Sequence, residues 1–341
     1  QAAAPRAGGA HAGQRMKATA PMHGRRGVLA GLAALATLAG GSAAAQDWPS
    51  RPLHLVVPLA AGGNADAVAR GLAQGLSARL GQPVVVENRP GAAGNIGMEH
   101  VARAAPDGHT LLYGVTAVAI NRSLYRLKFD PLVDLLPVVQ LNRVYLALFA
   151  RKDLPAATPR EVLAHVRANP GRISCASTGG ATQLGCALLQ STAGVPMLQA
   201  MYRGPVAALT DLSSGTVDLM VDTPNAARPF VESGRIRPVG TSAPQAQQSV
   251  VGELRSLSEA LPGYVLPGWH GIFAPAGTPP QRIQRLNQEI NEVLKSPEMQ
   301  RLLQDSGLEP IGGPAQVLAD LVRDDTARYH RIAREAGIQP E

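Results

Sequence analysis

The sequence predicts an α/β fold in which short strands alternate with helices. Runs of β-branched residues and helical stretches are joined by Gly- and Pro-rich turns, a pattern typical of strand–helix–strand units with largely parallel strands. The chain has 341 residues, which suits two domains or one large α/β unit. No long linker and no internal repeat divides it, so we expect lobes that share a continuous architecture.

The elements follow from local patterns along the chain. Residues 65–80 predict an amphipathic helix, because apolar residues recur at helical spacing and Gly81 can end it. Thr158, Pro159 and Glu161 predict the capped start of another helix. The predicted strands are residues 53–57, 83–88, 109–114, 138–150, 173–176, 217–222 and 235–241. The remaining predicted helices are residues 96–104, 226–232, 278–294 and 315–336.

Residues 1–45 are predicted to be upstream sequence followed by a secretory signal peptide that is cleaved after Ala45. A pair of arginines precedes an uncharged apolar stretch, 27–45, which ends in small residues. A transmembrane anchor is the alternative, but the Ala/Gly-rich composition favours a cleaved signal. Translation from Met16 or Met22, and export by the general or the twin-arginine route, both stay open. We therefore expect a periplasmic protein.

The positive charge of the whole chain belongs mostly to this leader. The formal net charge of +7 first suggests a nucleic acid or membrane partner. Residues 1–45 contain five of the 32 basic side chains and none of the 25 acidic ones, which leaves a net charge of +2 for residues 46–341. The case for a nucleic acid partner therefore disappears with the leader.

Motifs for catalysis or metal binding are missing from the sequence. No HExxH pair and no G-x-S-x-G elbow occurs, so we expect no catalytic residue, metal or cofactor, and no enzyme activity. Cys175 and Cys186 would meet an oxidising compartment after export. We expect a disulfide between them, and two buried free thiols are the alternative.

Three Gly-rich turns connect a strand to a helix and are the most informative motifs. They are residues 58–66 (PLAAGGNAD), 89–97 (RPGAAGNIG) and 177–182 (STGGAT). Such turns expose backbone N–H groups at the positive end of a helix, where a carboxylate or phosphate can bind. A P-loop lysine and the G-x-G-x-x-G spacing are both lacking, so nucleotide binding is unsupported. Tight turns capped by Asn64 and Asn95 are the purely structural alternative.

These residues, together with several longer segments, resemble the Bug-type receptors of tripartite tricarboxylate transporters. The resemblance is carried by residues 48–97, AAPDGHTLLYG (104–114), YRGPVAALTDLSSGTVDLMVD (202–222), PGWHGIFAPAGTP (267–279) and the helix start that follows. It implies a type II periplasmic-binding-protein fold, also called a Venus flytrap, with two lobes of mixed, mostly parallel sheets around a central cleft.

The resemblance also implies a domain organisation and partners. One lobe would comprise residues 46–145 and 268–341, and the other residues 146–267. The receptor would be a monomer that binds a small carboxylate through backbone N–H groups and bridging waters and delivers it to a membrane permease. An exported α/β enzyme and a ligand-sensing subunit of a two-component system share the fold and stay open as alternatives.

The ligand-binding residues implied by the resemblance lie mainly in the three turns. Arg203 would reach a carboxylate or pair with Asp211 or Asp218, and Asp222 would select a ligand amine or cap the next helix. The predicted ligand-binding residues are Leu59, Ala60, Gly62, Gly63, Asn64, Asp66, Gly91, Gly94, Asn95, Tyr113, Thr116, Val118, Ser177, Thr178, Gly179, Thr182, Arg203, Asp222 and Trp269, of which the aromatic Tyr113 and Trp269 would wall the cleft or, as the alternative, lie in the core.

The sequence departs from the family pattern at several of these positions. Asn64 stands where Ser or Thr is usual, Ala93 replaces a glycine, and Val118 replaces a common histidine. The two cysteines are not general to the family. We infer a less polar site and an altered ligand. We expect Gly63→Val and Gly94→Val to abolish binding while leaving the fold intact.

Overall fold

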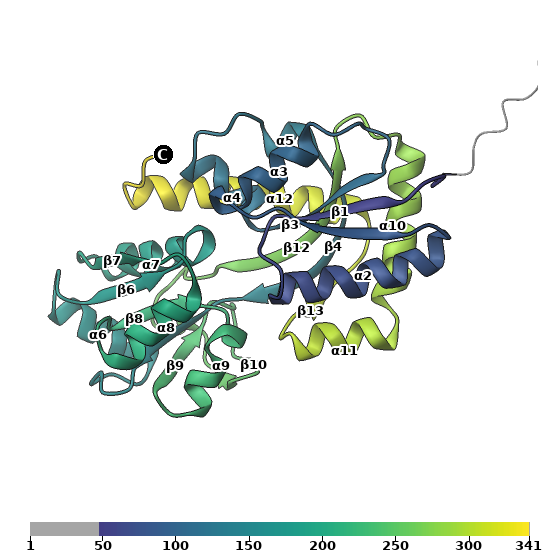
Figure 1. The fold of residues 1–341 in the computed structure, drawn as a ribbon. Helices are drawn as coiled ribbons and strands as arrows, with labels where there is room; N and C mark the ends of the chain where they lie inside the picture. The colour runs from purple at the N-terminus through teal and green to yellow at the C-terminus, as the bar shows by residue number, and fades with distance from the viewer. Residues whose placement is uncertain (1–47, 341) are drawn as a thin grey trace, which may run out of the picture. The chain divides into compact units, whose positions relative to one another are not determined.

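Two mixed sheets, one of six strands and one of five, organise the chain (Figure 1). The computed structural model describes residues 48–340, so the predicted signal peptide and its cleavage site lie outside the described residues. The six-stranded sheet and the helices around it are called the first lobe, and the five-stranded sheet with its helices the second lobe. The exact residues that divide the lobes stay a prediction, because Trp48–Glu341 form one compact unit.

The six-stranded sheet has the strand order β13-β4-β12-β3-β1-β2. β1 lies between β3 and β2 and is parallel to both, and its LHLVV sequence is almost fully buried, as expected for a strand covered on both faces. β12 runs antiparallel to β3 and β4. The strands are β1 (Leu53–Val57), β2 (Val84–Asn88), β3 (Thr110–Val115), β4 (Leu135–Tyr145), β12 (Pro267–Pro275) and β13 (Glu309–Pro310).

The five-stranded sheet has the strand order β7-β6-β8-β5-β9, and a separate two-stranded hairpin pairs β10 with β11. β6 is parallel to β7 and β8, whereas β5 is antiparallel to β8 and β9. The strands are β5 (Ala147–Arg151), β6 (Ser174–Ser177), β7 (Leu198–Met201), β8 (Leu219–Asp222), β9 (Ile236–Thr241), β10 (Gln247–Ser249) and β11 (Gly252–Leu254).

The chain passes between the two sheets at two neighbouring points. The predicted strand 138–150 is divided at Leu146, which separates β4 in one sheet from β5 in the other, and the chain returns at Pro267 with β12. Ser242 ties both crossings together: its Oγ accepts from the Leu146 N–H at 3.0 Å and donates to the Leu266 carbonyl at 3.0 Å. The crossing strands β12 and β5 run antiparallel to their neighbours, whereas most other strands of each sheet run in one direction, so the prediction of mixed, mostly parallel sheets is confirmed.

Helices cover the faces of both sheets (Figure 1). α2, α10 and α11 pack together beside β1, β2 and β4, while α12 contacts β4, α4 and also α7 of the second lobe. The helices are α2 (Asn64–Leu80), η1 (Ala92–Gly94), α3 (Asn95–Ala102), α4 (Ala117–Leu124), α5 (Pro131–Asp134), α6 (Pro159–Ala168), α7 (Gly180–Ala193), α8 (Pro205–Ser214), α9 (Pro224–Glu232), η2 (Leu257–Glu259), α10 (Pro280–Leu294), α11 (Pro297–Asp305) and α12 (Ala315–Glu335).

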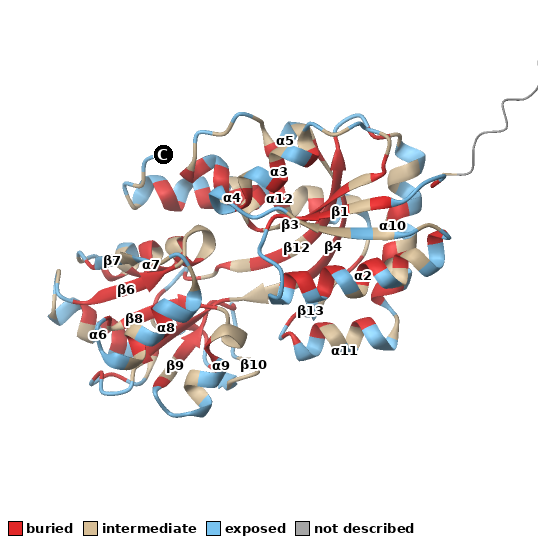
Figure 2. Cartoon of the chain, viewed as in Figure 1, coloured by how far each residue is buried: buried red, intermediate tan, exposed pale blue. Residues whose placement is uncertain are grey.

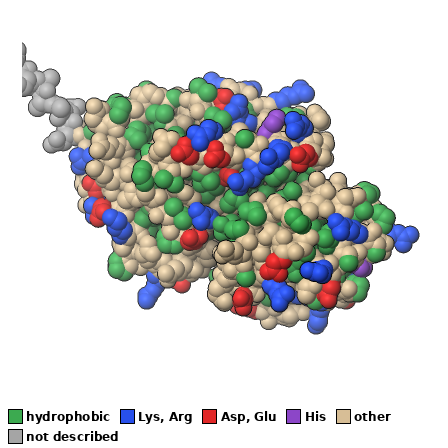
Figure 3. All heavy atoms as spheres, turned by 180° about the vertical axis from the view of Figure 1, so that it is seen from behind, with side chains coloured by type: hydrophobic (Ala, Val, Ile, Leu, Met, Phe, Trp, Pro, Cys, Tyr) green, Lys and Arg blue, Asp and Glu red, His purple; other side chains and the backbone are tan. Residues whose placement is uncertain are grey.

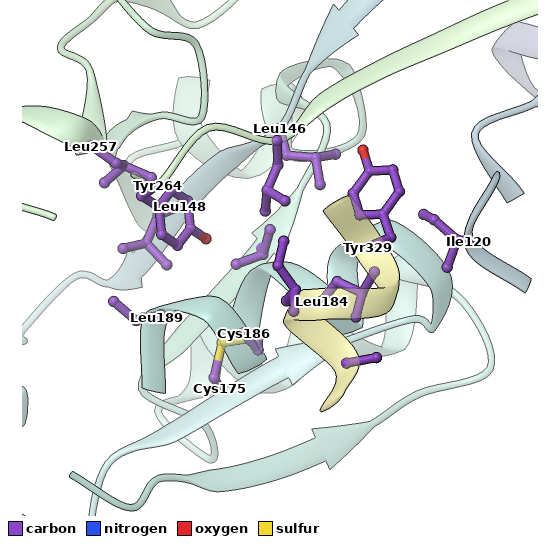
Figure 4. Packing of buried hydrophobic residues seen from close by; sticks show 14 of the residues in the cluster. Ile120, Leu146, Leu148, Cys175, Leu184, Cys186, Leu189, Leu257, Tyr264 and Tyr329 are labelled. Atoms are coloured by element: carbon purple, nitrogen blue, oxygen red, sulfur yellow. A yellow bond between two sulfur atoms is a disulfide. The ribbon is translucent and has the colours of Figure 1, made fainter. Parts of the chain in front are cut away.

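The buried residues concentrate in the strands and on the inner faces of the helices (Figure 2). One hydrophobic cluster continues from the first lobe through α12 into the second lobe, and Leu146, Leu184 and Tyr329 belong to it (Figure 4). Tyr329 also donates a hydrogen bond from its hydroxyl to the Pro267 carbonyl at 2.7 Å, at the point where β12 begins. The C-terminal helix thus packs on both lobes beside the crossing strands.

The disulfide and one capping box follow the sequence predictions. Cys175 on β6 and Cys186 on α7 are bonded, with both side chains fully buried in the same cluster (Figure 4). Thr158 and Glu161 exchange the predicted pair of capping hydrogen bonds at the start of α6. The proposed asparagine caps were wrong: the N-caps of α2 and α3 are Gly63 and Gly94, and neither helix has a side-chain cap.

Candidate functional site

A cavity of about 700 Å³ is lined by residues of both lobes. The first lobe contributes the turn before α2, the end of β4, His270 of β12 and the connection between α11 and β13. The second lobe contributes the start of α8, the end of β8 with the start of α9, and β10. A volume of this size matches the usual range for small-molecule sites.

Three helices begin at the cavity, and they come from both lobes. Gly63 and Asn64 at the start of α2, Pro205 at the start of α8 and Pro224 at the start of α9 all line it. The first N–H groups of a helix have no acceptor within the helix, and the helix dipole makes this end partly positive. Proline at the first position of α8 and α9 is compatible with helix entry and leaves the next N–H groups exposed.

The first Gly-rich turn is shaped by its own aspartate. Gly62 has φ +87°, a conformation that favours glycine, and its N–H donates to Asp66 Oδ2 at 3.0 Å. Arg70 Nε donates to the same oxygen at 3.0 Å. The Arg70 hydrogen bond, followed by the Gly62 N–H, lowers the pKa of Asp66 to about 2. Asp66 therefore holds the turn rather than facing the cavity, which corrects its predicted role as a ligand contact.

Asp222 ends β8 and presents a buried carboxylate to the cavity. Its side chain is only 6% exposed, and its Oδ1 accepts hydrogen bonds from the N–H and Oγ1 of Thr223 at 2.6 and 3.3 Å. Its Oδ2 has no hydrogen-bond partner among the described residues. Burial raises the pKa of Asp222 to about 6, against the opposing hydrogen bonds from Thr223.

We expect this carboxylate to make the protein less stable as the pH rises. The folded-state pKa of about 6 lies above the ordinary aspartate value of 3.8, so the folded state binds more protons between these two pKa values. Stability therefore falls from pH 4 to pH 7, by about 2 to 3 kcal/mol relative to Asp222→Asn. Urea unfolding of both proteins at several pH values measures this difference, which should grow with pH.

The exposed Asp153 provides the control for this experiment. Arg151 lowers the pKa of Asp153 by a hydrogen bond, so its contribution to stability has the opposite pH dependence. The difference between wild type and Asp153→Asn should therefore not grow in the same direction. A pH-independent difference between wild type and Asp222→Asn would show that the Asp222 carboxylate is not desolvated.

His270 lines the cavity from the first lobe and is neutral at ordinary pH. Burial lowers the pKa of His270 to about 4. Its Nδ1 lies 2.8 Å from the hydroxyl of Tyr113, and burial raises the pKa of that hydroxyl far above its ordinary value. The Tyr113 hydroxyl can donate to Nδ1, and Asn142 is its other side-chain hydrogen-bond partner. In that arrangement the Nε2 of His270 carries the ring proton and is a donor.

Five of the predicted ligand contacts line this cavity. They are Leu59, Ala60, Gly63, Asn64 and Asp222. These residues lie at the ends of β1 and β8 and at the start of α2, so the structure brings together the first Gly-rich turn and the aspartate of the second lobe.

The remaining predicted contacts lie elsewhere. Ser177 borders a separate cavity of about 90 Å³, and Arg203 is exposed. The alternative that Arg203 pairs with Asp211 or Asp218 was also wrong, because Asp211 accepts from Tyr202 and Asp218 binds Arg151 and Ser174. The predicted contacts outside the larger cavity's lining are Gly62, Asp66, Gly91, Gly94, Asn95, Tyr113, Thr116, Val118, Ser177, Thr178, Gly179, Thr182, Arg203 and Trp269.

The second and third turns are closed by side chains of the protein itself. Asn121 donates from Nδ2 to the Ala93 carbonyl at 3.0 Å and to Asn95 Oδ1 at 2.7 Å. Thr182 Oγ1 accepts from the Thr178 N–H and donates to the Gly179 carbonyl, both at 2.9 Å. Side chains of the protein thus stabilise these two turns, as expected for the alternative in which the turns are purely structural and bind no anion.

The predicted aromatic walls are buried in the core. Trp269, Tyr113 and Val118 are each 0% exposed. The Trp269 Nε1 donates to Asp325 Oδ2 at 2.8 Å, and its backbone N–H donates to Thr116 Oγ1 at 2.9 Å. Trp269 therefore bonds to Thr116 and to α12, so of the two predicted places for Trp269 the core is confirmed and the cleft wall was wrong.

Sequence reasoning missed several residues that line the cavity. His270 is one of them, and others lie at the end of β4, at the starts of α8 and α9, in β10 (Gln247–Ser249) and between Gln304 and Glu309. Alternation along β12 places His270 on the face opposite its neighbour Trp269, but the sequence does not show which of the two faces the core. The polar stretches 247–249 and 306–309 carry no comparable signal.

Charges are interspersed on the surface and sparse in the cavity. Figure 3 shows Lys and Arg mixed with Asp and Glu on the face it presents, without a large patch of one sign. The described lining of the cavity contains no Lys or Arg, while Asp222 and Glu309 are acidic. No group of side chains that could hold a metal ion occurs among residues 48–340. None of the described helices combines the length and apolar character that a membrane span requires.

Known proteins with similar sequences and structures agree on one family. A family model described as the tripartite tricarboxylate transporter family receptor, TctC, matches residues 68–338. The UPF0065 protein in the tcbD-tcbE intergenic region of Pseudomonas sp. strain P51 is 37% identical over 318 residues, covering 92% of this chain and 94% of its own.

The solved structures that resemble the chain include ligand complexes. Rpa4515 of R. palustris with adipate is 33% identical at a TM-score of 0.77, covering 86% of this chain and all of its own. The periplasmic binding protein BugD is 31% identical at a TM-score of 0.74, with coverages of 86% and 100%. MatC of Rhodopseudomonas palustris with malate is 31% identical at 0.72, with coverages of 84% and 99%. The chain therefore belongs to the TctC family of Bug-type periplasmic solute receptors.

Proposed function

We propose that this protein binds a small carboxylate in the 700 Å³ cavity and delivers it to the permease of a tripartite tricarboxylate transporter. The observation that carries the proposal is the meeting of three helix N-termini, those of α2, α8 and α9, at one cavity between the lobes. Backbone N–H groups there can hold a carboxylate without a cationic side chain. Adipate and malate in the solved relatives are also small carboxylates.

Closure of the two lobes over the ligand fits the way the chain crosses between them. The lobe boundaries we propose, at residues 145/146 and 267/268, lie where Ser242 ties the two crossings. A few residues at such crossings can absorb a hinge motion while each sheet moves as a unit. The permease would then distinguish the closed, loaded receptor from the open one.

Gly63→Val is expected to weaken carboxylate binding at least tenfold without unfolding the protein. A Cβ at position 63 meets nothing within 4 Å, and φ is −86°, so the backbone tolerates a side chain. The branched side chain would cover the first N–H groups of α2, where the carboxylate binds. Calorimetric titration measures the affinity, with Ala78→Val on the exposed part of the same helix as the control.

Gly94→Val is unsuitable for the same test, contrary to the sequence prediction. Gly94 has φ +89° and is buried, so a valine would strain the backbone whatever its effect on binding.

Two outcomes would contradict the proposed function. If the protein bound the amides of its ligands as tightly as the carboxylates, the proposal would be wrong. Conversion of the bound carboxylate to a product, followed by NMR, would favour an exported enzyme instead.

A further inference from the structure

His270 offers the cavity an uncharged ring that can present either a donor or an acceptor. It lines the cavity from β12, and burial lowers the pKa of His270 to about 4, so the ring is neutral at ordinary pH. A neutral imidazole has one N–H and one acceptor nitrogen. The nitrogen that carries the proton therefore decides which ligand atom the ring can bind.

The ring of His270 contacts Tyr113 of the neighbouring strand β3. The two strands are antiparallel, and Tyr113 is the partner of Ile272, two residues beyond His270, so the two rings are diagonal neighbours on one face of the sheet. Their centroids are 5.2 Å apart, and the Tyr113 hydroxyl lies 2.8 Å from Nδ1. Nε2 has no hydrogen-bond partner among residues 48–340. The tyrosine thus occupies one ring nitrogen and leaves the other for the cavity.

The second partner of the phenol indicates which way the proton lies. Asn142 of β4 is the partner of His270 across the sheet and also bonds to Tyr113, which is 0% exposed. Burial raises the pKa of Tyr113 and Asn142 lowers it, which is the effect of an N–H donated to the phenol oxygen. A phenol oxygen that accepts from Asn142 can give its own proton to Nδ1. The single ring proton of His270 is then on Nε2.

We propose that Tyr113 is a positioning residue that holds His270 in the tautomer whose Nε2–H donates to a carboxylate oxygen of the bound ligand. This inference rests on the proposed function and adds a ligand contact and its support. The described lining contains no Lys or Arg, so neutral donors supply the attraction for the anion. The opposite tautomer of His270 would turn a lone pair toward the carboxylate and repel it. A donor fixed before binding also loses less freedom when the ligand arrives.

The first measurement locates the ring proton without any ligand. A long-range proton–nitrogen correlation spectrum of the protein with isotope-labelled histidine shows which nitrogen is protonated, and His270→Gln identifies the His270 signals by their loss. We expect Nε2–H in wild type and a substantial share of Nδ1–H in Tyr113→Phe. Tyr264→Phe is the matched control, because Tyr264 is also 0% exposed but donates to the Gly185 carbonyl at 2.9 Å and belongs to a different hydrophobic cluster.

The second measurement is calorimetric titration with a panel of monocarboxylates and dicarboxylates that includes hexanoate, adipate and malate. For the panel member that wild type binds most tightly, we expect His270→Phe to weaken binding at least tenfold and Tyr113→Phe about threefold to tenfold. His270→Gln keeps an N–H donor and should retain more affinity than His270→Phe. Because Tyr113 acts through His270, adding Tyr113→Phe to His270→Phe should cause no further loss. Tyr264→Phe should bind as wild type does.

The possible results are distinct. A ring proton on Nδ1 of His270 in wild type would overturn this inference. Equal losses of affinity in Tyr113→Phe and Tyr264→Phe, or additive losses in the double variant, would also overturn it, because Tyr113 would then act only on stability. Carboxylate binding that is unchanged in His270→Phe would overturn it and leave the proposed function standing. Failure of wild type to bind any member of the panel would overturn the proposed function, and this inference with it.

Discussion

Replacing Gly97 with alanine is expected to lower the free energy of unfolding by about 2 to 4 kcal/mol. Gly97 lies in the first turn of α3, and a Cβ there would be 2.9 Å from both Cα and Cβ of Pro58 and 3.0 Å from the Arg89 carbonyl oxygen. These neighbours are backbone or ring atoms that cannot rotate away. The loss would be larger still without the gain in helix propensity from glycine to alanine.

Gly63→Ala is the matched control for this experiment. Position 63 has open space around a Cβ and a negative φ, so alanine should change stability by less than about 0.5 kcal/mol. Urea unfolding followed by circular dichroism measures both variants. Equal stability of Gly97→Ala and wild type would show that Pro58, which follows β1, can shift away from α3 without loss of stability. Because Pro58 opens the turn that lines the cavity, Gly97→Ala should also weaken ligand binding.

Trp269→Ala is expected to lower the free energy of unfolding by at least about 3 to 5 kcal/mol. The indole is 0% exposed, packs near Phe273 with ring centroids 6.1 Å apart, and donates to Asp325. Asp325 is itself 0% exposed, so removal of the indole leaves both a large void and a buried carboxylate with one donor fewer.

Trp269→Phe separates the hydrogen bond from the volume. We expect it to cost about 2 kcal/mol, because it keeps most of the ring and loses the donor to Asp325. Trp48→Phe is the control: Trp48 is half-buried and its Nε1 donates to the Asp107 carbonyl at 3.0 Å. Thermal or urea unfolding should rank Trp48→Phe, Trp269→Phe and Trp269→Ala in increasing order of destabilisation. If Trp269→Ala were as stable as wild type, Trp269 would not be a core residue, and its predicted place in the cleft wall would stand.

The fold was predictable because its signals are local. The apolar run of β1, the spacing in α2 and the capping box of α6 each depend on neighbouring residues. The division of the run 138–150 at Leu146 was not predictable, since nothing in that apolar run shows that Tyr145 and Ala147 belong to different sheets. That division depends on Ser242, almost one hundred residues further along the chain.

The candidate site was predictable in part for the same reason. Leu59, Gly63 and Asp222 follow strand ends, which the sequence indicates, and they line the cavity. Trp269 was assigned to the cavity instead of His270, although alternation along β12 places them on opposite faces. Which of the two faces the core depends on α12, which supplies Asp325 to the tryptophan, and that pairing is invisible in the sequence.

The absence of Lys and Arg from the described lining of the cavity affects how the receptor works in solutions of different ionic strength. A site built from helix ends and one aspartate exerts little long-range attraction on anions, so electrostatic steering would not speed association. Salt would screen little of the affinity, because the helix-end donors act on the ligand only at short range inside the cavity. Such a receptor would respond to the concentration of its ligand in much the same way in dilute and in saline surroundings.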